Sequence, residues 1–262
     1  MKNFFNKHLR LKKLLTVLLS LLFWLFLWIL CAYKAGNSLI LPSPGETFSR
    51  LSELAGTVEF YRICLYSLAR ILLGTVYGIV CGTVLAVCSA AIPAVNTLLT
   101  PAVTVVRATP VASFIILAML WLGMGALPAF IAALMVFPVL YQNIKEGIRQ
   151  VSADQLKLRT VFDLSLWKTV TKIYIPAVLP YFVSATVTAI GLSWKAGIAA
   201  EVLAFSPDSI GRKLSQSKNY LETVDLFAWT AAVVLLSLCI ELLFKKLIAL
   251  LLPHAVQKEA KQ

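Results

Sequence analysis

The sequence predicts an all-α membrane protein with six transmembrane helices. Hydrophobic residues make up 60% of the 262 positions, charged residues make up only 14%, and the mean hydropathy is +0.85. A soluble domain has about a quarter of its residues charged. The apolar residues also occur in runs near the roughly 20 residues that a helix needs to cross a bilayer. The net charge of +12 comes from short clusters beside these runs, which favours orientation in a bilayer over binding to nucleic acid.

The apolar runs place the six spans along one transmembrane domain that covers residues 1–262. The first run follows a basic cluster, but it is long enough to span and has no small-residue cleavage site, so we expect it to stay uncleaved. The run from 108 to 144 is too long for one span, and the turn "GMGALP" divides it. The expected spans are approximately 14–33, 65–90, 105–122, 128–144, 174–203 and 226–250.

The positive-inside rule gives an orientation to these spans. With the N-terminus inside, 16 of the 24 Lys and Arg residues fall in inside segments, Arg107 among them. We therefore expect both termini in the cytoplasm of a multi-pass protein of the inner (cytoplasmic) membrane. The polar segment 145–172 then lies in the cytoplasm.

Two shorter patterns predict local structure. Ser43, Pro44 and Glu46 form a helix-start signal before apolar residues at helical spacing, so we expect an amphipathic helix on the outer face, as a plain connector. Gly74, Gly78 and Gly82 recur every four residues, a stripe that lets another helix approach closely. We favour packing inside the bundle over a homodimer seam for this stripe.

The cytoplasmic segment is the strongest candidate for a functional site. Two short helices are expected in it, at 153–162 and 165–173, and both mix apolar with basic residues. Phe162, Leu164 and Trp167 can anchor the segment, while Lys157 and Arg159 can orient it. Such a segment buries its apolar face either in a groove on a partner or on the lipid surface.

This segment resembles the signature loop of the membrane-spanning subunits of binding-protein-dependent ABC importers. The loop's pattern is Glu-Ala-Ala, three residues, Gly, nine residues, then Ile-x-Leu-Pro. Ile173 and Pro176 match its end, the Gly position falls on Asp163, and the positions of Lys157 and Arg159 depart from it. The stretches "RATPVASFIILAMLWLGMG" and "IPAVLPYFVSATVTAIGLSWKAGIAAEV" are similar to the nitrate, sulfonate and taurine type of permease.

The resemblance implies a type I ABC importer permease fold, in which this loop forms coupling helices that fit a groove on a cytoplasmic ATPase. It also implies an extracytoplasmic substrate-binding protein, a permease homodimer and a small anion such as nitrate, a sulfonate or taurine as solute. A thiamine-precursor pyrimidine is the rival solute. Asp tolerates left-handed backbone and can cap a following helix, so we expect the turn at Asp163 to survive.

The chain itself is not expected to be an enzyme. It has no G-x-x-x-x-G-K-[ST] loop for nucleotide phosphates, so ATP hydrolysis is assigned to separate subunits. No cofactor and no metal site are expected, because the five cysteines lie in or beside apolar segments without a histidine cluster.

Lys195 and Glu201 are the candidate residues of a solute path, because ionisable groups inside a membrane are costly. Lys195 could favour an anion or neutralise an acidic residue, and Glu201 could contact a docked binding protein. An ATP-independent channel or secondary carrier is the main alternative. Broken half-helices would favour it, and only weak breaks are visible, at Pro110 and Gly191. A non-transporting signalling subunit is a third possibility.

Overall fold

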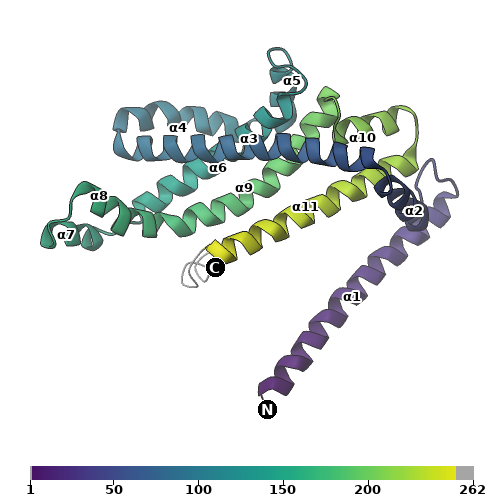
Figure 1. Ribbon diagram of the computed structural model, residues 1–262, viewed down its shortest axis with the longest axis horizontal. Helices are drawn as coiled ribbons and strands as arrows, with labels where there is room; N and C mark the ends of the chain where they lie inside the picture. Colours follow the sequence, from purple (N-terminus) through teal and green to yellow (C-terminus); the bar gives the residue numbers. More distant parts are fainter. Residues whose placement is uncertain (1, 252–262) are drawn as a thin grey trace. The chain divides into compact units, whose positions relative to one another are not determined.

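The computed structural model is all-helical over residues 2–251, the part of the chain that it describes, in agreement with the expected fold class. The predicted cytoplasmic C-terminus lies outside these residues. The elements in chain order are α1 (Lys2–Ala35), α2 (Pro44–Ala55), α3 (Val58–Ala91), α4 (Pro93–Ala108), α5 (Val111–Ala118), α6 (Leu127–Arg149), α7 (Ala153–Val161), α8 (Leu166–Thr169), the π-helix η1 (Val170–Tyr174), α9 (Ile175–Ala204), α10 (Ile210–Asn219) and α11 (Thr223–Leu251) (Figure 1).

Within residues 2–251, five helical stretches are long and apolar enough to cross a membrane, and α4 with α5 gives a sixth candidate if the bent pair counts as one span. The helix expected over 105–122 does not form in one piece, because α4 and α5 meet at 103°. Thr109 between them is extended, with φ −83° and ψ 131°. A residue that precedes proline favours this conformation, and Pro110 therefore ends α4.

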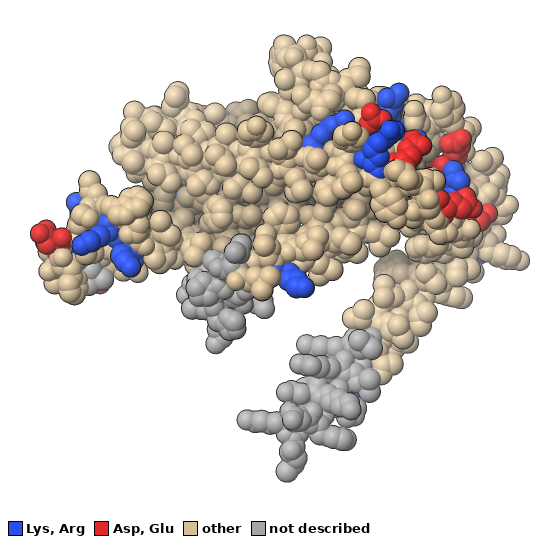
Figure 2. All heavy atoms as spheres, viewed as in Figure 1, with Lys and Arg blue, Asp and Glu red and all other residues tan. Residues whose placement is uncertain are grey.

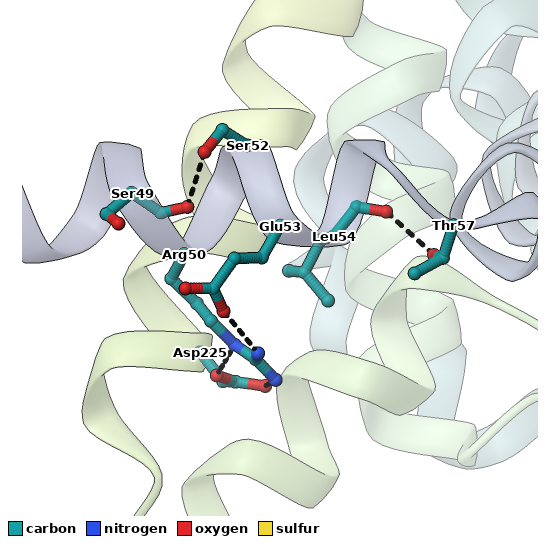
Figure 3. A network of polar contacts seen from close by, with 7 residues as sticks. All are labelled: Ser49, Arg50, Ser52, Glu53, Leu54, Thr57 and Asp225. Atoms are coloured by element: carbon teal, nitrogen blue, oxygen red, sulfur yellow. Dashed lines mark hydrogen bonds and ion pairs between the residues drawn. The ribbon is translucent and has the colours of Figure 1, made fainter.

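The chain divides into two compact units, and the first comprises residues 1–60 and 216–232. In it, α2 begins with the expected capping box: the Glu46 backbone N–H donates to Ser43 Oγ at 3.2 Å, and the Ser43 backbone N–H donates to Glu46 Oε2 at 2.7 Å. The Arg50 guanidinium donates to both Asp225 oxygens, at 2.6 and 3.1 Å, and to Glu53 at 2.8 Å (Figure 3). These contacts tie α2 to the start of α11.

The second unit comprises residues 61–215 and 233–262 and is built around α6 and α9, which pack along each other. The glycine stripe of α3 faces α6 in this unit. A Cβ added at Gly74 would lie 2.0 Å from the Ala129 carbonyl oxygen, and one at Gly78 would lie 2.7 Å from that of Ala133. At Gly82 the nearest atom would be Leu140 Cβ, at 2.8 Å. The stripe thus serves a close helix contact within one chain.

Charged side chains gather in a few groups on the face drawn in Figure 2, and one of these groups lies over α7 and α8. This group lies where α6 and α9 approach each other at one end of the second unit (Figure 1). A membrane protein keeps charges out of its apolar band. The segment predicted to be cytoplasmic is accordingly the polar end of these helices.

Candidate functional site

The predicted coupling segment forms two helices joined by a tight turn at Asp163. This residue has a positive φ of 43°. The Leu164 backbone N–H donates to the Arg159 carbonyl at 2.9 Å, which closes the end of α7. A left-handed residue followed by this six-to-one hydrogen bond is the Schellman arrangement, in which glycine is preferred. Asp163 therefore occupies a glycine position with the backbone geometry expected there.

The cap of α8 differs from expectation, because Asp163 does not supply it. Ser165 is the N-cap residue, and its Oγ accepts a hydrogen bond from the Lys168 backbone N–H at 3.4 Å. Asp163 lies too early to cap, since a cap side chain reaches the second or third residue of its own helix. The sequence carries a local sign of this cap, because a serine stands directly before the helix Leu166–Thr169.

Apolar side chains project into solvent on this segment. The exposed fractions are 75% for Val161, 67% for Phe162, 69% for Leu166 and 75% for Trp167. Leu164, between them, is half-buried. Two large aromatic residues on such a short polar segment form a surface that suits burial against a partner.

The basic residues of the segment lie on exposed positions of α7. Lys157 donates to Asp154 at 2.7 Å, and both side chains are largely exposed, so this pair contributes little to stability. Arg159 is also exposed. Their exposure leaves both side chains available to orient an encounter.

Ile173 and Pro176 lie where α8 continues into α9. Ile173 is buried in η1, and Pro176 stands in the first turn of α9. Pro176 cannot donate a backbone hydrogen bond, and its ring would collide with the carbonyl four residues earlier in a regular helix. A π-turn accommodates it, with the Ile175 N–H bonded to the Val170 carbonyl. Residues 166–204 are consequently one continuous helical path from α8 into a candidate span, so the helix expected over 165–173 and the span expected over 174–203 are joined.

The two candidate path residues lie in different environments on α9. Lys195 is exposed, whereas Glu201 has no exposed surface. Ser67 Oγ donates to Glu201 Oε2 at 2.8 Å, and the Gly211 backbone N–H donates to the same oxygen at 3.2 Å. Glu201 thus fastens the start of α10 to α3 and α9, and in this conformation it cannot touch a solute.

The positive-inside rule counts Arg107 among the inside segments, but the structure places it at the far end of α4. It lies in the last turn of α4, a helix of 16 residues that begins directly after α3. Such a helix is about 24 Å long. Arg107 therefore stands far from the turn that joins α3 to α4, and the orientation of the termini remains a prediction.

The family of the chain follows from a match over most of its length. A family model described as "Binding-protein-dependent transport system inner membrane component" matches residues 74–255. The chain belongs to this family. The matched residues include the coupling segment, three of the five candidate spans in full and the second half of α3. Members of the family are inner membrane components of transport systems rather than enzymes.

Curated relatives agree with the family. The bicarbonate transport system permease protein CmpB of Synechocystis sp. is 38% identical over 93 residues, which cover 35% of this chain and 33% of CmpB. The chain thus matches about a third of the length of that relative. The putative aliphatic sulfonates transport permease protein SsuC of Bacillus subtilis is 24% identical, with 73% of this chain and 70% of SsuC covered. The taurine transport system permease protein TauC of Escherichia coli is 22% identical, with 82% and 80% covered.

A solved structure supports the fold. It is described as the crystal structure of an amino acid ABC transporter with histidines and superimposes with a TM-score of 0.60 at 16% identity. The match covers 78% of this chain and 94% of that chain. At this level of identity the likeness concerns the arrangement of helices and not the solute.

Proposed function

We propose that the chain is the permease subunit of an ATP-driven ABC importer and that the segment 153–173 docks into a cytoplasmic ATPase. The observation that carries this proposal is the exposed apolar surface of Phe162, Leu166 and Trp167 beside the left-handed turn at Asp163. A soluble flank with two exposed aromatic residues is costly unless a partner covers it. The ATPase subunits, an extracytoplasmic binding protein and a second permease copy are the proposed partners.

The continuous path from α8 to α9 gives this docking a mechanical consequence. Because η1 joins the two helices without a loop, a displacement of Trp167 by an ATPase moves the start of α9 with it. Helices transmit such motion as rigid bodies, whereas a flexible loop would absorb it. ATP-driven closure of two ATPase subunits thereby alternates the permease between inward-facing and outward-facing states.

The proposed solute is a small anion. The relatives are named for the transport of bicarbonate, sulfonates and taurine, and these solutes share a compact oxyanion group. Lys195, exposed on α9, supplies a positive charge on a candidate span and is the proposed path residue. Glu201 is proposed as a structural residue of the same unit, because its Oε2 accepts two hydrogen bonds within the fold.

Transport by reconstituted vesicles tests the proposal. The chain is purified with its ATPase and binding protein and reconstituted into vesicles. Uptake of labelled bicarbonate, taurine and ethanesulfonate is then measured with and without ATP on the side of the ATPase. We expect uptake of at least one of these solutes that requires both ATP and the binding protein. Uptake that proceeds without ATP, driven by an ion gradient, would favour the secondary-carrier alternative instead.

A further inference from the structure

A polar pocket of 390 Å³ is lined by residues of α4 and α6. Its size lies within the range of small-molecule sites, roughly 300 to 1,000 Å³. The charged residues of its lining belong to the end of α6, within the segment 145–172 that the sequence predicts to be cytoplasmic. The polar side chains of its lining include Thr100, Thr104, Gln142, Lys145, Glu146 and Arg149.

Lys145 in this pocket has no carboxylate partner within the described residues. Its half-buried ammonium donates to Asn96 Oδ1 and lies 5.6 Å from the centroid of the Tyr141 ring. Both partners are neutral. The Tyr141 hydroxyl in turn donates to Ser89 Oγ at 3.0 Å, which fixes the ring. The fold therefore holds a positive charge in place without neutralising it.

The other charges that line the pocket do not supply the missing counter-ion. Glu146 lies 3.6 Å from Arg149 and accepts a hydrogen bond from Gln150 at 2.7 Å. One carboxylate thus faces two cations, and the lining carries a surplus of one positive charge. An ammonium with neutral partners in a partly buried site favours the binding of an anion.

The hydrogen-bonding groups of the walls agree with an oxyanion. The Thr100 and Thr104 hydroxyls donate to backbone carbonyls at 2.7 and 2.8 Å, so they make the wall polar without adding a free donor. The Gln142 amide makes no hydrogen bond among the residues that the structure describes and has two N–H groups to offer. Lys145 retains two further N–H donors.

We propose that the pocket between α4 and α6 binds a compact oxyanion, with the Lys145 ammonium as its anchor and the Gln142 amide as a second donor. Two sources present this chemistry at the end of a membrane span: a free solute and the phosphate of a lipid headgroup. The free-solute form rests on the proposed function, whereas the site itself rests on the geometry alone. The binding test below needs neither ATPase nor binding protein, so its failure is distinct from a failure of the proposed function.

The test measures the thermal stability of the purified full-length chain in nanodiscs of phosphatidylcholine at low ionic strength. Sulfate, bicarbonate and ethanesulfonate are titrated, with gluconate as a bulky reference anion. We expect saturable stabilisation by at least one of the three probes. Lys145→Gln is expected to weaken it about ten-fold or more, whereas Lys145→Arg retains the charge and the binding. Lys34→Gln, which removes an exposed lysine outside the pocket, is the matched control and leaves binding unchanged.

A second variant guards against misfolding of Lys145→Gln. Asn96→Asp places a carboxylate beside the intact lysine, at the position where Asn96 Oδ1 already meets it. This internal counter-ion should abolish oxyanion binding while Lys145 and its packing remain. Binding that persists at full strength in Asn96→Asp and in Lys145→Gln would overturn the proposal.

The lipid arm repeats the experiment in nanodiscs that contain phosphatidylglycerol. If the source is a lipid headgroup, phosphatidylglycerol abolishes the stabilisation by the free probes, and native mass spectrometry finds this lipid retained on the wild type but lost from Lys145→Gln. If the source is a free solute, the probes stabilise the chain with or without this lipid. If wild type and Lys145→Gln show equal stabilisation by the probes and equal retention of phosphatidylglycerol, the proposed site does not exist.

Discussion

The backbone N–H of Leu164 donates to the carbonyl of Arg159 at 2.9 Å, and this one hydrogen bond closes α7 over a left-handed Asp163. The bond turns the chain so that α8 starts two residues later, at Leu166. Phe162 and Trp167 lie on either side of this turn, and both are exposed. The surface proposed for the ATPase thus depends on a backbone conformation at a single residue.

Substitutions at Asp163 test that dependence. Left-handed backbone costs most residues about 1–2 kcal/mol, and glycine avoids this cost. Asp163→Gly should therefore keep the turn, and Asp163→Val should open it. Amide hydrogen exchange over residues 153–165 is the measurement: faster exchange is expected in Asp163→Val only. Equal exchange in the two variants would contradict the assigned role of the turn.

The contact between α3 and α6 leads to a second prediction. Gly74→Ala places a methyl group 2.0 Å from the backbone carbonyl oxygen of Ala129, which cannot move without its helix. Overpacking of this kind costs about 1–3 kcal/mol. Gly191 lies within α9 with nothing within 4 Å of an added Cβ, so Gly191→Ala is the matched control. We expect a lower midpoint of thermal unfolding for Gly74→Ala and an equal or higher one for Gly191→Ala.

Glu201 carries a third prediction, on the stability of the second unit. Glu201→Ala leaves Ser67 and the Gly211 N–H without their buried partner and opens a cavity, at a cost of about 2–4 kcal/mol. Glu201→Gln keeps an acceptor oxygen and should lose less. Glu241→Ala removes an exposed carboxylate that is paired with Lys245 at 2.5 Å on α11, and we expect only a small change there. Thermal unfolding in one detergent compares all three variants. A loss for Glu241→Ala as large as that for Glu201→Ala would count against the structural role.

The start of α2 gives a prediction about pH. Hydrogen bonds from the Ser43 backbone N–H and from its hydroxyl hold the pKa of Glu46 below its ordinary value of 4.5. A carboxyl group whose pKa is lowered on folding stabilises the fold above the unfolded pKa, and this contribution is lost as the pH falls through the lower folded pKa. The protection of the amides at residues 43–47, measured as exchange relative to the intrinsic rate at each pH, should therefore decrease below about pH 4.5. Glu46→Gln should remove most of this pH dependence, and its persistence would assign the effect to another group.

The sequence predicted the helical class and most spans because bilayer thickness acts on hydropathy summed over some 20 residues, which needs no knowledge of partners. The helix start at Ser43 depends only on neighbouring residues, and the structure confirms it. The bend between α4 and α5 was underestimated because the two helices together are as apolar as one span, and hydropathy does not register direction. Pro110 carried the signal.

Properties that depend on distant parts of the chain could not be predicted. The placement of Glu201 depends on Ser67, 134 residues earlier, and on the backbone of Gly211. A buried and an exposed glutamate look alike in a sequence. Likewise, the sequence shows Lys145 as a basic residue at the end of a span, and only the structure places Asn96 and Tyr141 beside its ammonium group.

Co-purification measures directly whether Phe162 and Trp167 anchor an ATPase. The tagged chain is isolated from native membranes, and the amount of nucleotide-binding subunit and its ATP hydrolysis are measured for the wild type, for Phe162→Ala/Trp167→Ala and for Trp121→Ala. Trp121 is 77% exposed and lies outside the coupling segment, so its variant is the control. We predict that the double variant loses the ATPase about ten-fold or more while Trp121→Ala retains it. If the double variant binds as much ATPase as the wild type, Phe162 and Trp167 do not anchor it.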